Sequence, residues 1–150
     1  MGTLEASHTV EIEAPLERVY EVAADVANCD KWTPSVLEVE VIEKHPDGSA
    51  KLVEMENDAL VKKTKTILSY GYDGPTGISW EQEKGDPKWL TGTWELIAID
   101  DGRTRAVYTL RTDPGRVLGL LLRGPVEGKV KEFLSKGAAE GLKEYVEANG

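Results

Sequence analysis

The sequence has little of what a disulfide framework or a membrane anchor requires. Its 150 residues include one cysteine, Cys29, so no internal disulfide can form, and a reducing compartment suits the chain. The longest apolar run, residues 117–122, contains Gly119 and falls far short of the roughly 18 residues of a membrane-spanning helix. Residues 1–7 lack the basic and apolar parts of a secretory signal. These absences predict a cytoplasmic protein that does not insert stably into a membrane.

Positive charge is also scarce. Lys and Arg number 18 against 27 Asp and Glu, which gives a formal net charge of -9. Because phosphate groups are bound by basic faces, this balance argues against nucleic acid or an anionic membrane as a partner. Apolar residues make up 40% and charged residues 30%, which is typical of a globular protein. We therefore predict a single domain over residues 1–150, large enough to bury a core.

The N-terminal part predicts one strand and two helical segments. Apolar and polar residues alternate over residues 8–13, which indicates a half-buried strand. Pro15 suits the first position of a helix, and apolar residues then recur with helical period to about Asn28. A very short helical turn is expected over residues 29–32. It should end there, because the residue before Pro34 is disfavoured in helical geometry.

The middle of the chain predicts an antiparallel meander. Residues with a backbone preference for turns separate six strand-like segments, and the short connections favour antiparallel pairing. The N-terminal strand makes seven. The six segments are residues 36–44, 49–56, 60–72, 78–84, 88–100 and 103–112.

Alternation along these strands separates an interior face from a solvent face. The predicted interior set is Val53, Met55, Leu68, Tyr70, Tyr72, Ile78, Trp80, Gly92, Trp94, Leu96, Ala106, Tyr108 and Leu110. The predicted solvent set is Ser79, Glu81, Glu83, Thr93 and Glu95.

The C-terminal stretch, residues 115–149, predicts one long helix of about 45 Å, with Pro125 either kinking it or starting its main part. Its apolar stripe should lie on the interior face of the sheet. Glycines in the stripe, such as Gly137 and Gly141, favour close backbone approach or open space beneath the helix. A curved sheet wrapped around a single helix leaves an interior wider than side chains fill, which makes a pocket.

The order of strand, two short helices, six strands and long helix resembles the helix-grip fold of the START/SRPBCC superfamily, and in particular its polyketide cyclase/dehydrase branch. The phrases that carry the resemblance are Ile12-Glu13-Ala14-Pro15 with Val19-Tyr20, Asp25 with Trp32-Thr33-Pro34, Leu68-Ser69-Tyr70, Ile78-Ser79-Trp80 with Gly85-Asp86, Gly92-Thr93-Trp94, and Asp101-Gly102-Arg103-Thr104 with Tyr108. The resemblance implies an α+β domain with a deep apolar cavity for lipids, polyketides, isoprenoids or sterols. Some members cyclise aromatic polyketides, and others resemble coenzyme Q-binding proteins or ribosome-association toxins.

On this basis we expect binding of a hydrophobic small molecule between the sheet and the C-terminal helix. For the aromatic residues the alternative is ordinary core packing, and for Trp32 it is a hydrophobic plug. Filling the cavity by Gly137→Phe should then abolish ligand uptake. The predicted ligand-binding residues are Trp32, Met55, Leu68, Tyr70, Trp80, Trp94, Leu96, Tyr108, Leu122, Val130, Phe133 and Leu134.

Signals for catalysis are weak. No phosphate loop, dinucleotide fingerprint or nucleophile elbow is present, so we expect no cofactor. His8 and His45 are the only histidines and lack a second ligand cluster, so no metal site is predicted. Polar groups predicted to face inward are the catalytic candidates if an aromatase/cyclase or dehydratase reaction occurs. They are Asn57, Thr66, Tyr70, Gln82 and Tyr108.

Two further interpretations concern partners. The run 117–122, flanked by Arg116 and Arg123, is either packed under the rim of the sheet or a gate that touches a membrane transiently. A ribosome- or protein-binding module is the third functional class, which the acidic balance disfavours for direct RNA contact. The sequence leaves the oligomeric state open.

Overall fold

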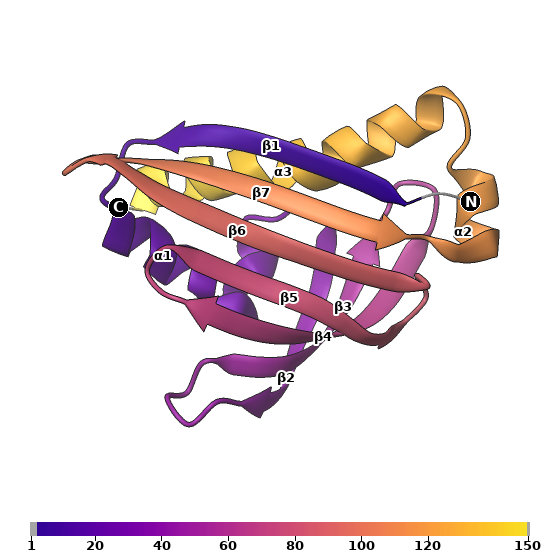
Figure 1. The fold of residues 1–150 in the computed structure, drawn as a ribbon, viewed down its shortest axis with the longest axis horizontal. Coiled ribbons are helices and arrows are strands. Elements are labelled where there is room, and N and C mark those ends of the chain that lie inside the picture. The colour runs from indigo at the N-terminus through magenta and orange to yellow at the C-terminus, as the bar shows by residue number, and fades with distance from the viewer. Residues whose placement is uncertain (1–2, 150) are drawn as a thin grey trace.

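The computed structural model describes residues 3–149, which form one seven-stranded antiparallel sheet and four helices (Figure 1). The strand order is β1-β7-β6-β5-β4-β3-β2, so the predicted meander is confirmed and the first and last strands lie side by side. In chain order the elements are β1 (Leu4–Ile12), α1 (Leu16–Ala24), the 3-10 helix η1 (Val26–Lys31), β2 (Val36–Lys44), β3 (Ala50–Asp58), β4 (Lys63–Asp73), β5 (Gly77–Gly85), β6 (Trp89–Asp100), β7 (Arg103–Asp113), α2 (Gly115–Leu121) and α3 (Pro125–Asn149).

The first helical region is divided where a single helix to Asn28 was predicted. Pro15 precedes α1, and Asp25 leaves helical geometry with φ −81° and ψ 71°. The Asp25 carboxylate accepts a hydrogen bond from Asn28 Nδ2 at 2.7 Å, which stabilises the bend. The chain then continues as η1, so the predicted turn at 29–32 is part of a longer 3-10 helix.

The turn predicted at Asn57-Asp58 lies slightly later. Both residues belong to β3, where Asn57 pairs with Thr64 of β4. The chain reverses over residues 59–62 instead, and Leu60 has a left-handed φ of 67°. The Asp58 carboxylate accepts a hydrogen bond from the Leu60 amide at 2.8 Å, which holds the turn.

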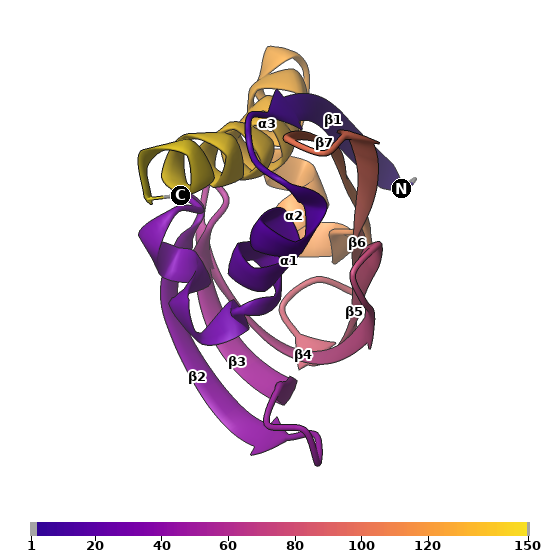
Figure 2. The same ribbon diagram turned by 90° about the vertical axis from the view of Figure 1, so that its left-hand side faces the viewer.

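The two faces of the sheet agree with the predicted alternation. Ile78, Trp80, Trp94 and Leu96 are buried, and the five residues assigned to solvent are exposed. The sheet curves so that its interior face surrounds the helices (Figure 2).

The prediction of one continuous helix over residues 115–149 was wrong. Two helices, α2 and α3, occupy this stretch. Leu122 leaves helical geometry with ψ 60°, and Gly124 takes a left-handed φ of 62°. Pro125 then begins α3, as proline at a first helical position favours. Figure 1 shows α2 turned away from the axis of α3 at one end of the molecule.

The interior is tightly packed at only one end. Val19, Leu142 and Val146 have no solvent exposure there, where α1, the second half of α3 and β1 meet. The first half of α3 carries Val130 and Leu134, which face a cavity. None of the helices in residues 3–149 combines the length and apolar character that a transmembrane segment requires.

Candidate functional site

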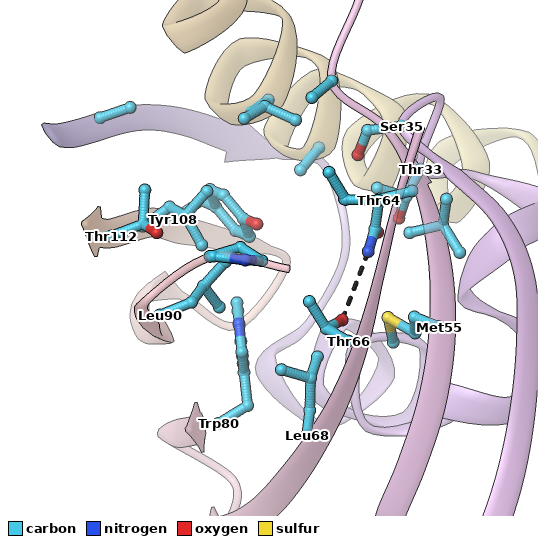
Figure 3. Close-up of a pocket in the computed structure, with 18 of the residues that line it drawn as sticks. Thr33, Ser35, Met55, Thr64, Thr66, Leu68, Trp80, Leu90, Tyr108 and Thr112 are labelled. Atoms are coloured by element: carbon cyan, nitrogen blue, oxygen red, sulfur yellow. Dashed lines mark hydrogen bonds between the residues drawn. The ribbon is translucent and has the colours of Figure 1, made fainter. Parts of the chain in front are cut away.

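A cavity of about 150 Å³ lies between the interior face of the sheet and helices α2 and α3 (Figure 3). β3 and β4 supply Met55 and Leu68 to one wall, while β5 and β7 supply Trp80 and Tyr108 to the opposite wall. Val130 and Leu134 of α3 form the roof. A space of this size holds roughly one aromatic ring, whereas pockets for drug-sized ligands measure about 300–1,000 Å³. A larger ligand therefore requires part of the wall to move.

Ten of the twelve predicted ligand-binding residues line this cavity. They are Trp32, Met55, Leu68, Tyr70, Trp80, Trp94, Tyr108, Leu122, Val130 and Leu134.

Leu96 and Phe133 lie elsewhere. Leu96 has the predicted interior orientation, but it sits further along β6 inside the packed core and is 1% exposed. Phe133 lies in a shallow surface groove on α3 together with Lys129 and Glu140. Gly137 also lies in that groove and faces Pro34, so Gly137→Phe would not fill the cavity.

Aromatic rings form a continuous wall along one side of the cavity. Tyr70 stacks on Trp80 with ring centroids 5.6 Å apart, and Trp80 lies 5.6 Å from Tyr108. Tyr108 meets Trp94 edge-on at 4.9 Å, and Trp94 lies 6.1 Å from Trp32. These separations are within the range of favourable aromatic contacts, so the rings hold one another in place.

Two tyrosine hydroxyls contribute polarity without charge. Within residues 3–149, neither the Tyr70 nor the Tyr108 hydroxyl hydrogen-bonds to another protein group. Burial raises the pKa of both tyrosines well above the ordinary value, and the nearby Cys29 thiol adds to the shift of each. Each therefore stays protonated at neutral pH and can donate a hydrogen bond to a ligand oxygen.

The remaining catalytic candidates offer little. Asn57 donates a long hydrogen bond of 3.4 Å to Thr66, and both line the cavity (Figure 3). Gln82 does not line it: its Nε2 donates to the Pro87 carbonyl at 2.7 Å, and its Oε1 is buried without a partner among residues 3–149. Lys131 is the single charged residue in the lining, and no carboxylate belongs to it. The described cavity lining thus offers hydrogen-bond donors to a ligand but no strong base that could remove a proton from it.

Sequence reasoning missed several lining residues. Lys131 follows the charged side of the helical pattern, yet its half-buried chain reaches the cavity beside Val130. Thr33 and Ser35 lie in a connection, where alternation gives no signal. The thiol of Cys29 also lines the cavity, and burial raises its pKa to about 12. Across residues 3–149, no group of three or more His, Cys, Asp or Glu is placed to hold a metal ion.

Comparisons with solved structures place this fold among known relatives. A START superfamily protein from Mycobacterium smegmatis superposes with a TM-score of 0.85 at 17% identity, over 99% of this chain and 100% of that chain. The Zhui aromatase/cyclase of Streptomyces sp. R1128 gives 0.83 at 21% identity, over 99% and 96%. A protein from Thermus thermophilus gives 0.84 at 26% identity, over 98% and 99%.

The predicted helix-grip fold is thereby confirmed. No curated protein matches the chain. The sequence family described as polyketide cyclase / dehydrase and lipid transport matches residues 3–147. Because the match spans nearly the whole chain, this protein belongs to the polyketide cyclase / dehydrase and lipid transport family.

Proposed function

We propose that this protein binds a hydrophobic small molecule in the cavity between the sheet and helices α2 and α3. The observation that carries the proposal is the lining, which is largely apolar and aromatic and contains no carboxylate. Burying an unpaired charge there would be costly, whereas an apolar ligand would gain from leaving water. The family to which the chain belongs supports the same class of ligand.

The hydroxyls of Tyr70 and Tyr108 refine the expected ligand. Both belong to half-buried side chains that line the cavity, neither has a protein acceptor among residues 3–149, and both stay neutral. A ligand that carries a carbonyl or ether oxygen beside an aromatic or aliphatic body would satisfy them. We expect such a ligand to bind more tightly than a hydrocarbon of the same shape.

A matched pair of probes tests this expectation. Binding of acetophenone and of ethylbenzene, each with a single ring, is measured by the change in tryptophan fluorescence, since Trp80 and Trp94 line the cavity. The ketone should bind roughly fivefold more tightly, as one net hydrogen bond implies. Tyr70→Phe combined with Tyr108→Phe should remove that preference. Equal affinities in the wild-type protein would exclude the proposed role of the hydroxyls.

A cavity-filling variant tests the site itself. Thr66 is 3% exposed and lines the cavity, so Thr66→Phe should occupy the space and abolish binding of both probes. Thr93 lies on β6 and is exposed on the outer face of the sheet, so Thr93→Phe is the matched control. Unchanged probe binding by a folded Thr66→Phe protein would overturn the proposal.

A polyketide aromatase/cyclase is the second candidate function. The same two hydroxyls favour it, because neutral donors held in an apolar site polarise a substrate carbonyl and stabilise the enolate that cyclisation requires. The cavity lacks a carboxylate or histidine base, so the proton would pass to water or to a second substrate oxygen. Turnover of a poly-β-ketone mimic that falls in Tyr70→Phe or Tyr108→Phe would support this activity. If the protein binds the probe but does not turn over the mimic, the cyclase activity is refuted and ligand binding remains as the function.

A further inference from the structure

Helix α2 is a thin wall between the cavity and solvent. Leu118 is buried and lines the cavity, as does Leu122 just beyond the helix. On the opposite side of the same helix, Val117 is 64% exposed and Leu120 is 56% exposed. A movement of α2 away from the cavity would therefore open the cavity to the surface of the molecule.

Helix α2 begins at one glycine in left-handed geometry and is followed, three residues after its end, by another. Gly115 has φ 81° and Gly124 has φ 62°, and an added Cβ at Gly124 would meet nothing within 4 Å. Backbone at such positions turns without steric cost to a side chain. The seven residues of α2 thus lie between two glycine turns, the kind of position at which a hinge can take up a change in backbone angles.

Exposed apolar side chains gather around this wall. We define the cavity rim as residues 58–65, 84–89 and 113–131; each segment supplies residues to the cavity lining, such as Val61, Pro87 and Leu118. The rim contains six of the nine large hydrophobic residues that are exposed in the described part of the chain. The six are Leu60, Trp89, Val117, Leu120, Leu121 and Val126.

The charge of the rim is opposite to that of the rest of the molecule. It holds nine of the 18 Lys and Arg but four of the 27 Asp and Glu, a net charge of +5 against -14 elsewhere. Three of the four acids, Asp58, Asp86 and Asp113, accept hydrogen bonds from backbone amides of the rim itself. The overall charge of -9, which argued against an anionic membrane, therefore hides a basic end.

In the described part of the chain, the rim cations also form no salt bridges, unlike most of the other Lys and Arg residues. Within residues 3–149, none of the nine rim cations lies within salt-bridge distance of a carboxylate. Six of the nine Lys and Arg outside the rim do form such pairs. The free cations, including Arg116 and Arg123 on either side of α2, are available to an external anionic partner.

We propose that the cavity rim docks on an anionic lipid bilayer, with the exposed leucines of α2 entering the interface and the surrounding Lys and Arg contacting lipid headgroups. Apolar residues surrounded by cations, with an aromatic residue such as Trp89 nearby, are the side-chain set that binds anionic interfaces. Docking would exchange the solvent face of α2 for lipid and let the cavity exchange its ligand with the membrane. The inference rests on the proposed binding of an apolar molecule, because it names the surface that supplies or receives it.

Vesicle co-sedimentation tests the docking surface. The full-length protein is mixed with vesicles of phosphatidylcholine alone or of phosphatidylcholine with phosphatidylserine. We expect binding to the anionic vesicles only, weakened by added salt. The double variant Leu120→Asn/Leu121→Asn should lose at least about tenfold in binding, as the loss of two interfacial leucines implies. Arg116→Gln/Arg123→Gln should bind less tightly and show a smaller salt dependence.

The control is Ile42→Asn, since Ile42 is 48% exposed on β2, away from the rim. It should bind vesicles as the wild type does. Absence of vesicle binding by the wild type would overturn the inference. So would self-association, or capture of an acidic protein, that depends on Leu120 and occurs without vesicle binding.

The proposed function is tested separately by binding of acetophenone from solution without vesicles. Leu120→Asn/Leu121→Asn should retain that binding, because neither residue lines the cavity. Vesicle binding without probe binding would refute the ligand proposal and keep the docking surface. The reverse result would refute the docking surface alone.

Discussion

Gly92 allows Trp80 to lie in the aromatic wall. The two residues are cross-strand neighbours on β6 and β5, and a Cβ on Gly92 would overlap the indole of Trp80. The missing side chain thus creates the space that the ring occupies, and the ring in turn covers the bare backbone.

We predict that Gly92→Ala lowers the free energy of unfolding by about 1–3 kcal/mol, the usual cost of overpacking. It should also weaken probe binding, because Trp80 lines the cavity and would have to shift. Gly102→Ala is the control, since a Cβ there meets nothing within 4 Å. Urea titration of both variants measures the difference; equal stabilities would contradict this account of Gly92.

Cys29 gives a second prediction at this scale. Burial raises the pKa of its thiol to about 12, so at neutral pH it carries roughly a thousandfold less thiolate than an exposed cysteine. Iodoacetamide should therefore alkylate the folded protein far more slowly than the urea-unfolded protein, as followed by mass spectrometry. Comparable rates in the two states would show that the thiol is accessible and ionised.

At the scale of elements, α3 is tied to the start of the chain by a carboxylate. Glu147 accepts hydrogen bonds from the Lys143 ammonium at 2.7 Å and from the Glu13 amide at 2.9 Å. These donors lower the pKa of Glu147 below its ordinary value. Because the folded pKa is the lower one, the stabilisation is present above the unfolded pKa and is lost as pH falls through the folded pKa.

We predict that Glu147→Gln costs about 0.5 kcal/mol of unfolding free energy at neutral pH, as expected for an exposed ion pair. The difference from wild type should shrink toward zero as pH falls through the folded pKa of Glu147, below which the wild-type carboxylate is protonated too. Glu144→Gln, which removes an exposed glutamate of the same helix, is the control. A difference independent of pH would show that the charge of Glu147 is not its source.

Strands β5 and β6 and helix α3 show which features of the fold could be predicted from the sequence and which could not. Side-chain alternation is a local property, so the interior faces of β5 and β6 could be predicted residue by residue. Depth along a strand is not local: Trp94 lines the cavity and Leu96, two residues on, belongs to the core. The stripe glycines permitted close approach or open space, and Gly141 shows the former, since a Cβ there would overlap the Trp32 carbonyl.

The end of α2 illustrates the same limit. The apolar residues of 117–122 are interrupted only by Gly119, so the pattern favours one helix that continues into residues 125–149. Pro125 indicates a start or a kink, and only the tertiary structure decides between them. Glycine at 124 takes the left-handed turn that separates α2 from α3, a conformation that composition alone does not require.

For the whole molecule, a packed end and a hollow end imply unequal sensitivity to the same mutation. Leu142 of α3 has no exposure and lies in the core, whereas Leu134 of α3 is half-buried above the cavity. We predict that Leu142→Ala costs about 2–5 kcal/mol of unfolding free energy, as in other cores. Leu134→Ala should cost clearly less, because it enlarges an existing space.

Chemical denaturation of the two variants supplies the comparison on one helix with one residue type. Leu134→Ala should additionally accept a bulkier ketone than the wild type does, which probe titration measures. A larger stability loss for Leu134→Ala than for Leu142→Ala would contradict the division into a packed and a hollow end.

The pairing of β1 with β7 has a consequence for how the chain is made. Residues 4–12 pair with residues 104–112, so the first strand of this sheet to leave the ribosome pairs with the last strand of the sheet. Until that partner emerges, Val10 and Ile12 stay unburied and β1 presents unpaired backbone. Contacts this distant in sequence are slow to form and leave early segments exposed during synthesis. The sheet is therefore completed only when β7 has been translated, and until then β1 is the strand most in need of protection from aggregation.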